Sequence, residues 1–599
     1  MLSSITYMEP STTLIRRKWD SLEHKGIAFP PEYRPRGISV VILGEKFILN
    51  ADQEELVYAW ASKKDTHYVQ DSIFQSNFLK DFRKLLPQKF QAISNISAID
   101  FSEAFRIVDE ERKIKEAEKE RIRNLSPDEK KRLALSKRAE KERTKAIYGK
   151  AIVDGIEVDI ANWLAEPPGL FMGRGQHPLR GKWKPRVRHQ DVILNLGEDA
   201  SVPEGPWHKI VHDHSSMWIA TWMDKLTLKR KYVWLHDSSA LRQNSDKEKY
   251  DKAANLGRHI DKVEKEIINR MIRTSDTHQK KIATVCYLIF KLAMRVGDEK
   301  DPEEADTVGA STLRVEHIKF PSRSGKQLLE FNFLGKDSVP WQKTLQIDSE
   351  DTKALYNNLR LFMNRKESGS HIFDGITSAK VNSFLRTIDS KNVPGLTAKV
   401  FRTYIATRTL KESLTSPPIA VDKNSSEPDK IYVAKIANLK AAITCNHKKG
   451  IDPRNPASKK ALERFEEAAK KRRETIEKLQ GEIAAKKWKT DHQKKRLYER
   501  LNKVETQLKL QMETRDYNLG TSLRNYIDPR VMKDWLNYVG LNWEKIYTAT
   551  LRRKFKWAED YNTRDSEDLE SLSSPSEQIE VVQEETHNIP YADVTQSHR

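Results

Sequence analysis

The sequence predicts a multidomain α+β protein that carries one long antiparallel helical hairpin. Its 599 residues are enough for roughly three or four domains with ample cores. Segments that alternate as strands do, such as GISVVILGEKFIL at 37–49, are interspersed with long, charged helical segments. Between residues 458 and 512, apolar residues recur at three- and four-residue spacings on two arms. These three observations define the fold class.

The N-terminal third mixes strands with charged helices. Residues 1–25 form an N-terminal extension, and 103–148 are strongly helical. Within that segment SPDE, at 126–129, offers an N-cap serine, a proline at the first helical position and a glutamate at the third. One helix therefore ends before Ser126 and another begins there. The segment ANWLAEPPGLFMGRGQHP then breaks the helical pattern with proline and glycine.

The middle of the chain alternates between strands and helices. Residues 190–235 contain four short strands, DVILNL, WHKIVHD, MWIATWM and KYVWLH. Residues 247–297 are helical, and 311–347 are expected to form a three-stranded meander from TLRVEHIKF, QLLEFNFLG and TLQID. Helices dominate again to about residue 450, and no internal repeat is evident.

The helical hairpin is the clearest single element. Its two arms are separated by a polar break near KKWKTDHQ. Residues 459–515 contain 18 Lys or Arg and 10 Asp or Glu, a net charge of +8. A basic rod could lie over DNA, or it could be a solvated coiled coil that acts only as a spacer. After about residue 565 the chain becomes acidic and serine-rich, and we expect residues 566–599 to be a disordered tail.

The composition favours an intracellular protein that binds a polyanion. Lys and Arg number 106 against 86 Asp and Glu, and the isoelectric point is about 9.4. Such an excess is typical of nucleic-acid binding, although it also fits a merely charged, soluble surface. The two cysteines, Cys286 and Cys445, provide no disulfide framework. The sequence has neither an apolar run of eighteen residues nor a secretory signal, so we expect no membrane span.

Motifs for cofactors are absent. The sequence Gly173-Arg174-Gly175 lacks the third glycine of a dinucleotide fingerprint, and no P-loop occurs. Cys445 and His447 have no second pair at zinc spacing, and HDHSS at 212–216 is better explained as surface polarity than as a metal site. We therefore expect no cofactor and no metal.

Phosphate chemistry without a metal needs fixed cations, a nucleophile and an acid for the leaving oxygen. Four contexts offer cations: Arg295 at the end of an apolar helix, Lys336 in a tight hairpin turn, Arg402 in a helical run and His447 at a helix end. Taken singly, these residues are better explained as a buried salt bridge, a turn residue, a surface helix charge and a helix cap. Likewise, the tyrosine in LRNYIDPR, Tyr526, would usually be a hydrogen-bonded core residue.

Taken together, these segments resemble the eukaryotic-type type IB DNA topoisomerases. The similarity extends in family order from about Trp19 to Ala558. It is carried by LEHKGIAFPPEY, EPPGLFMGRGQHP, MRVGDEK, ADTVGASTLRVEHI, FLGKDS, GLTAKVFRTY, CNHKK, LGTSLRNYIDPR and EKIYTATLRRKFKWA. Several long, separated motifs in the same order make the resemblance specific.

The resemblance implies a bilobed clamp on duplex DNA that relaxes supercoils by nicking one strand, letting it swivel and resealing it, without ATP or metal. It also implies a catalytic lobe related to tyrosine recombinases and a monomeric protein with mainly backbone contacts to double-stranded DNA. The implied domains are a DNA-binding cap lobe at 26–227, a catalytic core lobe at 228–452, a coiled-coil linker at 453–510 and a C-terminal domain at 511–565.

The resemblance also assigns roles to residues. Tyr526 matches the nucleophile that forms a 3′-phosphotyrosyl link, and Lys336 matches the lysine that protonates the 5′-oxygen. Arg295, Arg402 and His447 match the groups that hold the non-bridging oxygens. The positions expected to line DNA or the cleavage site are Arg174, Asp337, Asn525, Lys231 and Lys399. Asn525, Asp337 and Arg174 match positions that contact camptothecin-type poisons in relatives, so we expect this chain to be sensitive to these poisons.

Three departures from the family pattern stand out. The long Lys-rich N-terminal region of nuclear relatives is missing, which would fit a shorter archaeal member. We therefore expect the protein on chromosomal DNA, either in a nucleoid or in a nucleus. Met172 replaces an arginine often found in its motif. The acidic tail is extra.

Two alternatives remain from the sequence. A tyrosine recombinase uses a similar Arg-Lys-His/Lys-Arg-Tyr set for the same bond chemistry, but Lys399 stands where recombinases usually have histidine. A non-catalytic architectural DNA-binding protein would explain the charge and the coiled coil. It would not explain why Arg295, Lys336, Arg402, His447 and Tyr526 all lie in segments that match the family's motifs.

Overall fold

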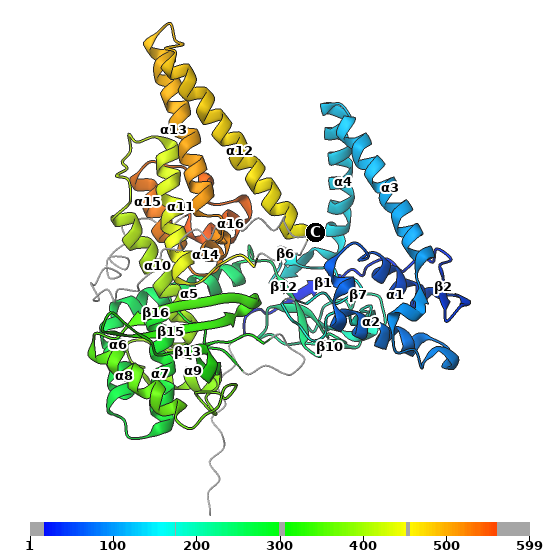
Figure 1. The fold of residues 1–599 in the computed structure, drawn as a ribbon, viewed down its shortest axis with the longest axis horizontal. Coiled ribbons are helices and arrows are strands. Elements are labelled where there is room, and N and C mark those ends of the chain that lie inside the picture. Colours follow the sequence, from blue (N-terminus) through cyan, green and yellow to red (C-terminus); the bar gives the residue numbers. More distant parts are fainter. Residues whose placement is uncertain (1–16, 174, 299–305, 451–455, 560–599) are drawn as a thin grey trace, which may run out of the picture. The chain divides into compact units, whose positions relative to one another are not determined.

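The computed structural model describes residues 17–173, 175–298, 306–450 and 456–559, which form two compact units (Figure 1). The first contains the described residues up to Gly173 together with Pro178–Asp246, and the second contains Gly175–His177 and the described residues from Lys247 onward. This division lies later than the boundary expected after residue 227. The reason is that Arg230–Leu235 pairs within the sheet of the first unit. The expected mixture of α and β structure is confirmed.

A seven-stranded, mainly antiparallel sheet forms one half of the first unit. Its strand order is β1-β5-β6-β12-β11-β9-β10, and only β9 and β10 pair in parallel. The four strands expected at 190–235 are all present. The strands are β1 (Leu22–His24), β5 (Lys150–Val153), β6 (Ile156–Ala161), β9 (Val192–Asn195), β10 (Lys209–Val211), β11 (Trp218–Met223) and β12 (Arg230–Leu235).

The other half of the first unit packs helices on a small sheet around aromatic side chains. The hairpin expected at 37–49 is confirmed, and its core contains Trp60, Phe74, Phe78 and Phe82, all buried. The elements are β2 (Ser39–Ile42), β3 (Glu45–Ile48), β4 (Ile99–Asp100), α1 (Ala51–Ala61) and α2 (Ser72–Leu85), with the short pair β7 (Gly169–Leu170) and β8 (Trp183–Lys184).

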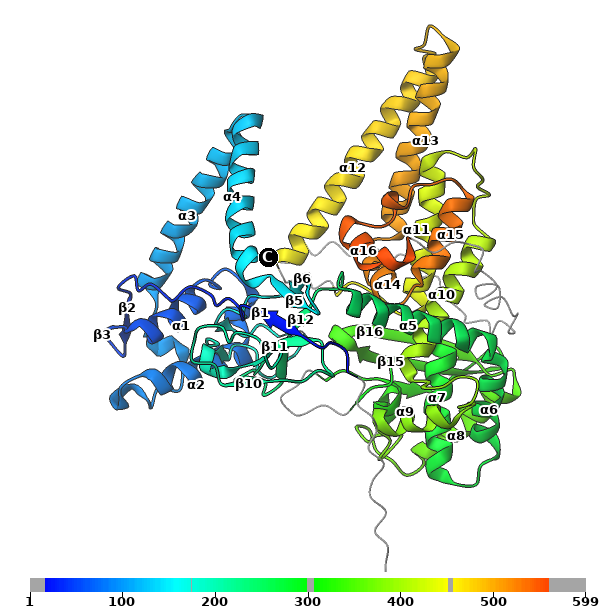
Figure 2. The same cartoon turned by 180° about the vertical axis from the view of Figure 1, so that it is seen from behind.

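Two long, exposed helices, α3 (Ser102–Asn124) and α4 (Pro127–Tyr148), lie side by side in both views (Figures 1 and 2). The predicted break between them is confirmed, because Ser126 is the N-cap of α4 and forms a capping box with Glu129. Few side chains of α3 and none of α4 are buried, so water solvates these charged helices on most of their surface.

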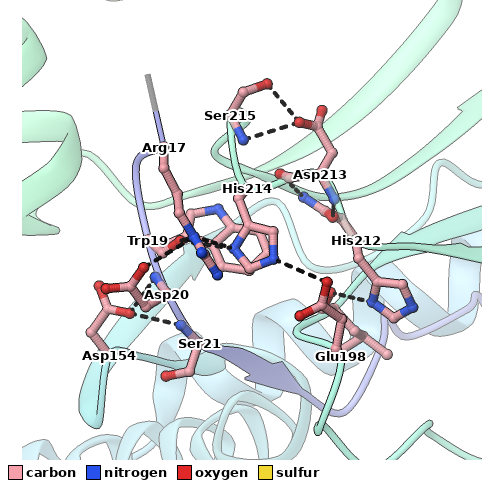
Figure 3. Close-up of polar contacts among 12 residues, drawn as sticks. Arg17, Trp19, Asp20, Ser21, Asp154, Glu198, His212, Asp213, His214 and Ser215 are labelled. Atoms are coloured by element: carbon pink, nitrogen blue, oxygen red, sulfur yellow. Dashed lines mark hydrogen bonds and ion pairs between the residues drawn. The ribbon is translucent and has the colours of Figure 1, made fainter. Parts of the chain in front are cut away.

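The HDHSS segment anchors the N-terminal strand of the first unit (Figure 3). The indole of Trp19 stacks on His214 with ring centroids 4.1 Å apart, and its Nε1 donates to the carbonyl of Ser216 at 2.6 Å. The Asp213 carboxylate accepts from the Ser215 hydroxyl and backbone at 2.6 and 3.0 Å. These residues are mostly half-buried structural groups, and no cluster of ligands able to hold a metal was found among the described residues.

The second unit is built from helices around a four-stranded sheet. The helix α7 is buried on all sides over most of its length and passes through the core. The elements are α5 (Ala240–Arg258), of which the part from Lys247 onward belongs to this unit, α6 (Ile260–Arg273), α7 (Thr277–Leu292), β13 (Ile318–Lys319), β14 (Ser322–Arg323), β15 (Lys326–Gly335), β16 (Val339–Gln346), α8 (Glu350–Met363), α9 (Ser378–Thr387), α10 (Ala398–Thr415) and α11 (Glu427–Thr444).

The prediction of a first strand of the meander at 312–320 is wrong. Residues 312–320 form a 3₁₀ turn, Val315–His317, followed by the two-residue strand β13. Side chains compete with the strand pattern there: the His317 Nδ1 accepts from the Arg314 backbone at 3.0 Å, and Thr312 Oγ1 accepts from the Gly309 backbone at 3.0 Å. The remaining pair, β15 and β16, forms the expected hairpin in antiparallel register.

The C-terminal part consists of two rods and three short helices. The rods α12 (Pro456–Ala484) and α13 (Asp491–Glu513) run antiparallel, since Arg472 bonds Gln511 and Gln480 bonds Glu505 (Figure 1). The predicted hairpin is thus present, while its coiled-coil packing and linker role stay predictions. The short helices are α14 (Leu519–Asn525), α15 (Pro529–Tyr538) and α16 (Ala549–Lys554). No helix among the described residues could span a membrane, and the expected acidic tail lies outside those residues.

Candidate active site

Tyr526 lies in the turn between two helices of the second unit. It is the C-cap of α14, where its backbone N–H donates to the carbonyl of Ser522 at 3.0 Å. Asp528 is the N-cap of α15 and Pro529 its first residue, so the DPR sequence starts a new helix. Ile527 between them is fully buried. The tyrosine is therefore fixed by a helix end on each side.

Buried polar groups hold this turn in place. The hydroxyl of Thr407 donates to the carbonyl of Tyr526 at 3.2 Å and accepts from the backbone N–H of Asp528 at 3.1 Å. The guanidinium of Arg530 binds the Asp528 carboxylate through two nitrogens and reaches Asp251 at 2.7 Å. Because all of these partners are satisfied, the backbone around Tyr526 has little freedom to shift.

Arg402 lies beneath the tyrosine and is only 5% exposed. One terminal nitrogen donates to the carbonyl of Ala293, and the other donates to the carbonyl of Cys445 at 3.0 Å. Its guanidinium carbon is 5.1 Å from the ring centroid of Tyr526. The alternative of a surface helix charge is wrong, because α10 places this side chain in the core.

Arg295 follows the end of α7. The helix stops at Leu292, since Ala293 adopts a left-handed conformation with φ 52°, and Arg295 lies three residues beyond. A close approach of two glycines fixes this segment: a side chain on Gly309 would lie 2.5 Å from Gly297. The side chain of Arg295 is half-buried, and no hydrogen bond or ion pair of it was found among the described residues. Burial and the charge of Arg402 lower the pKa of Arg295.

Lys336 lies in the turn between β15 and β16, as expected. Asp337 and Ser338 in this turn have positive φ values of 67° and 56°. Lys336 is exposed and lines a small cavity of about 30 Å³ together with Arg295, Arg402 and Cys445. The structure therefore brings three of the four predicted cations to one cavity.

His447 completes the set of side chains around Tyr526. Its ring stacks on that of Tyr526 with centroids 5.0 Å apart, and its Nδ1 is 2.7 Å from the hydroxyl of Ser522. The ring is 4% exposed. Burial, with the charges of Arg402 and Arg295, lowers the pKa of His447 to about 3, so the imidazole is neutral at physiological pH. Although it follows the end of α11, the imidazole forms no helix-capping bond in the described structure.

The electrostatic setting of Tyr526 is unusual for a half-buried tyrosine. Burial acts to raise the pKa of its hydroxyl, whereas the charges of Arg402 and Arg295 act to lower it, and the net pKa lies below the usual value near 10. Tyr404 and Tyr547, which are buried away from this pair of arginines, have raised pKa values. The two arginines thus favour the phenolate at this one position.

Neutral His447 predicts a pH dependence of stability. Between the folded pKa of about 3 and the unfolded value of 6.5, the unfolded chain binds more protons, so stability is lost as pH falls below 6.5. We expect the His447→Gln variant to escape about 2 kcal/mol of the loss that the native protein suffers between pH 6.5 and 5, measured by urea unfolding. The exposed His278, replaced by Gln, is the control for a histidine-to-glutamine change outside the site. Equal pH dependence of the His447→Gln variant and the native protein would contradict a neutral His447.

The other predicted residues are distributed as follows. Asn525 precedes Tyr526 and is exposed, Asp337 follows Lys336, and Lys399 is exposed one turn before Arg402 on α10. Lys231 belongs to the first unit, where its Nζ is 3.5 Å from Glu166. Arg174 lies outside the described residues.

Sequence reasoning missed several residues that shape the site. Ser522 and Thr407 hold His447 and the Tyr526 backbone, but small polar residues inside helical segments carry no distinctive signal. Lys343 donates to the carbonyl of Leu292 at the end of α7 at 3.1 Å. Burial lowers its pKa to about 8. Its period-2 position in β16 could have identified it as a residue facing the core.

A tyrosine next to two arginines, a lysine and a neutral histidine defines a class of site suited to a phosphate diester and a phenolic nucleophile. Three family models match the chain in sequence order. They are Eukaryotic DNA topoisomerase I, DNA binding fragment, at residues 17–235; Eukaryotic DNA topoisomerase I, catalytic core, at 238–483; and C-terminal topoisomerase domain, at 498–567.

Relatives named DNA topoisomerase 1 agree with these matches. The chain is 35% identical to the Drosophila melanogaster protein over 550 residues, and 34% identical to the Homo sapiens protein over 577 residues. It is 35% identical to DNA topoisomerase 1 alpha of Arabidopsis thaliana over 585 residues. These alignments cover 90%, 92% and 93% of this chain. The chain therefore belongs to the family of eukaryotic-type type IB DNA topoisomerases.

The chain does not span the full length of all these relatives. It covers 54% of the Drosophila protein, 60% of the Arabidopsis protein and 72% of the human protein. The matched part includes the catalytic core and the C-terminal domain in which Tyr526 lies.

Proposed function

We propose that the chain relaxes positively and negatively supercoiled DNA by transient nicking of one strand, rotation and religation, without ATP or metal. The observation that carries the proposal is the position of Tyr526, with Arg402 5.1 Å from its ring, His447 stacked on the ring and the charge of Arg295 close enough to lower its pKa. A diester phosphate brought to this tyrosine would meet a nucleophile and its charge stabilisers together.

The cleavage step is an exchange of one phosphodiester for another. The phenolate oxygen of Tyr526 attacks phosphorus, the new P–O bond forms, and the bond to the 5′-oxygen breaks. The electron pair leaves with that oxygen, which takes a proton from Lys336 to become a 5′-hydroxyl. The DNA 3′-end stays attached as a phosphotyrosine. Religation reverses each step, and because the bond energy is conserved in the ester, no ATP is required.

The chain's own cations supply the electrostatic stabilisation. Arg402 is locked by two carbonyls, whereas the side chain of Arg295 has no partner among the described residues. As the phosphorane gains charge, a preoriented guanidinium stabilises it without reorganising. This arrangement supports the proposal that the site needs no divalent ion.

Duplex DNA is the proposed partner of the whole chain. The net charge of +20 favours the phosphate backbone, so contacts should be mostly to phosphates and sequence preference weak. Lys399, Asn525, Asp337, Arg174 and Lys231 are proposed to contact the DNA or to line the cleavage site, and the chain to act as a monomeric clamp on chromosomal DNA. The basic rods α12 and α13 are proposed to link the core to the C-terminal part and to slow strand rotation by drag.

The role of Lys336 can be tested by changing the leaving group. We expect the Lys336→Ala variant to cleave ordinary DNA roughly 10²- to 10⁴-fold more slowly than the native protein. A substrate with sulfur in place of the 5′-bridging oxygen needs little protonation, and with it the variant should recover most of the rate. Lys319→Ala, an exposed lysine in the same sheet, is the control and should match the native protein on both substrates. Failure of sulfur to restore the rate would remove Lys336 as the acid.

The proposed function is tested with plasmids of each supercoil sign, incubated with the protein in EDTA without ATP. We expect stepwise relaxation of both and greater nicking in the presence of camptothecin. Relaxation that needs ATP or a divalent ion would sink the metal-free mechanism. Activity confined to one DNA sequence and accompanied by strand exchange would indicate a tyrosine recombinase, and a gel shift without relaxation would indicate an architectural protein.

A further inference from the structure

The imidazole of His447 is held at one nitrogen and free at the other. Its Nδ1 lies 2.7 Å from the Ser522 hydroxyl, while its Nε2 is buried and has no partner in the described part of the chain. A buried nitrogen without a partner is costly unless a ligand fills the position. The unfilled position lies in the same site as Tyr526, whose ring stacks on the imidazole.

A neutral imidazole carries one proton, and the partner of one nitrogen decides where that proton resides. Burial, with the charges of Arg402 and Arg295, lowers the pKa of His447 to about 3, so the ring is neutral. If Nδ1 holds the proton, Nε2 presents a lone pair, which repels an anionic oxygen. If Nε2 holds it, this nitrogen can donate to that oxygen.

Ser522 is placed to decide between the two tautomers. It is fully buried in α14, and His447 is the partner found for its hydroxyl among the described residues. When the hydroxyl donates to Nδ1, its own proton is satisfied and Nε2 must carry the N–H. When the hydroxyl accepts instead, its proton stays buried without a partner, which is costly.

We propose that Ser522 is a positioning residue that fixes His447 as the Nε2–H tautomer, so that Nε2 can donate to a non-bridging oxygen of the DNA phosphate. The proposal rests on the proposed function for the identity of the oxygen, but not for the tautomer.

The same residue links the histidine to the nucleophile. The carbonyl of Ser522 accepts the backbone N–H groups of Tyr526 and Ile527, both at 3.0 Å, and the backbone N–H of Asn518 donates to the carbonyl of His447 at 2.8 Å. The N-cap residue of α14 is thus tied to His447, and its C-cap residue, Tyr526, is tied to Ser522 in the middle of the helix. One helix therefore sets the spacing between the N–H donor and the phenolic oxygen.

The tautomer can be measured in the free protein by nitrogen NMR with ¹⁵N-labelled histidine, assigning His447 from its loss in the His447→Gln variant. We expect the native protein to show a protonated Nε2 and a bare Nδ1, and the Ser522→Ala variant to show a mixture. Ser413→Ala is the matched control, because Ser413 is also buried but its hydroxyl has no partner in the described structure. A protonated Nδ1 in the native protein would overturn the proposal, and this result requires no variant other than the one used for assignment.

The catalytic consequence is measured by single-turnover cleavage of duplex DNA in a double-mutant cycle. We expect Ser522→Ala to slow cleavage roughly 10- to 100-fold, which is the usual effect of removing the hydrogen-bond partner that orients a functional histidine. We expect the affinity for DNA to be unchanged. Combined with His447→Ala, it should add almost nothing, because both changes remove one interaction. Fully additive losses would show that Ser522 acts only on the helix, and would contradict the positioning role.

The NMR measurement and the cleavage assay together distinguish failure of this inference from failure of the proposed function. A native protein with the expected tautomer that cleaves no DNA would refute the proposed function and leave the hydrogen bond assigned. A protein that cleaves DNA but carries the opposite tautomer would keep the function and refute the role of Ser522.

Discussion

Replacing Tyr526 by phenylalanine is expected to abolish strand cleavage while leaving the fold and DNA affinity intact. The change removes only the hydroxyl that would attack phosphorus and its hydrogen bond with the Arg402 side chain, whereas the stacking on His447 and the backbone bonds of the turn remain. Loss of a nucleophile usually costs more than about 10⁴-fold in rate. Single-turnover cleavage and a filter-binding isotherm on the same duplex measure the two effects.

The control for this change is Tyr517→Phe. Tyr517 is another half-buried tyrosine of the C-terminal part, and burial raises its pKa instead of lowering it. It should keep the native cleavage rate within a small factor. Residual cleavage by the Tyr526→Phe variant at a rate close to the native one would place the nucleophile elsewhere.

Replacing Arg402 by lysine is expected to reduce both stability and activity, although the charge is kept. The guanidinium fork binds the carbonyls of Ala293 and Cys445 together, and one ammonium group cannot replace both bonds at the same positions. We expect a loss of about 1.5–3 kcal/mol in the free energy of unfolding. We also expect cleavage to slow by roughly 10²- to 10³-fold, as for other oxyanion donors. Urea unfolding and single-turnover cleavage measure these quantities.

Arg408→Lys on the same helix separates the two effects. Arg408 pairs with Glu412 at 3.3 Å and is partly exposed, so its replacement should cost less than about 1 kcal/mol and spare cleavage. If Arg402→Lys lost stability but cleaved DNA at the native rate, Arg402 would be a structural residue and not a stabiliser of the transition state.

The elements predicted from sequence were those with strong local signals. The break at Ser126 was predicted because its capping box is local, and the β15–β16 pair because its alternation spans a whole strand. The strand expected at 312–320 failed because His317 and Thr312 bond the nearby backbone instead. The late boundary of the first unit depends on pairing between distant strands, which a local pattern does not contain.

In the candidate site too, some residues were predictable from sequence motifs, while the roles of others depend on tertiary packing. Tyr526, Arg295, Lys336, Arg402 and His447 came from motif resemblance, and the structure brings these five side chains of the second unit to one site. The burial of Arg402 could not be predicted, because its partners come from segments more than 40 residues away in the chain. Ser522 and Thr407 were missed because their roles arise only when the turn between α14 and α15 packs against α10, and α14 packs against α11.

The most direct test of the central claim is to identify the covalent bond between protein and DNA. A duplex whose short downstream strand is lost after cleavage would trap the intermediate, and trypsin would release the peptide Asn525–Arg530. Mass spectrometry after nuclease digestion should find a nucleotide 3′-phosphate on Tyr526, and end labelling should find a free 5′-hydroxyl on the released strand. Attachment through a 5′-phosphate, or to any other residue, would contradict the account.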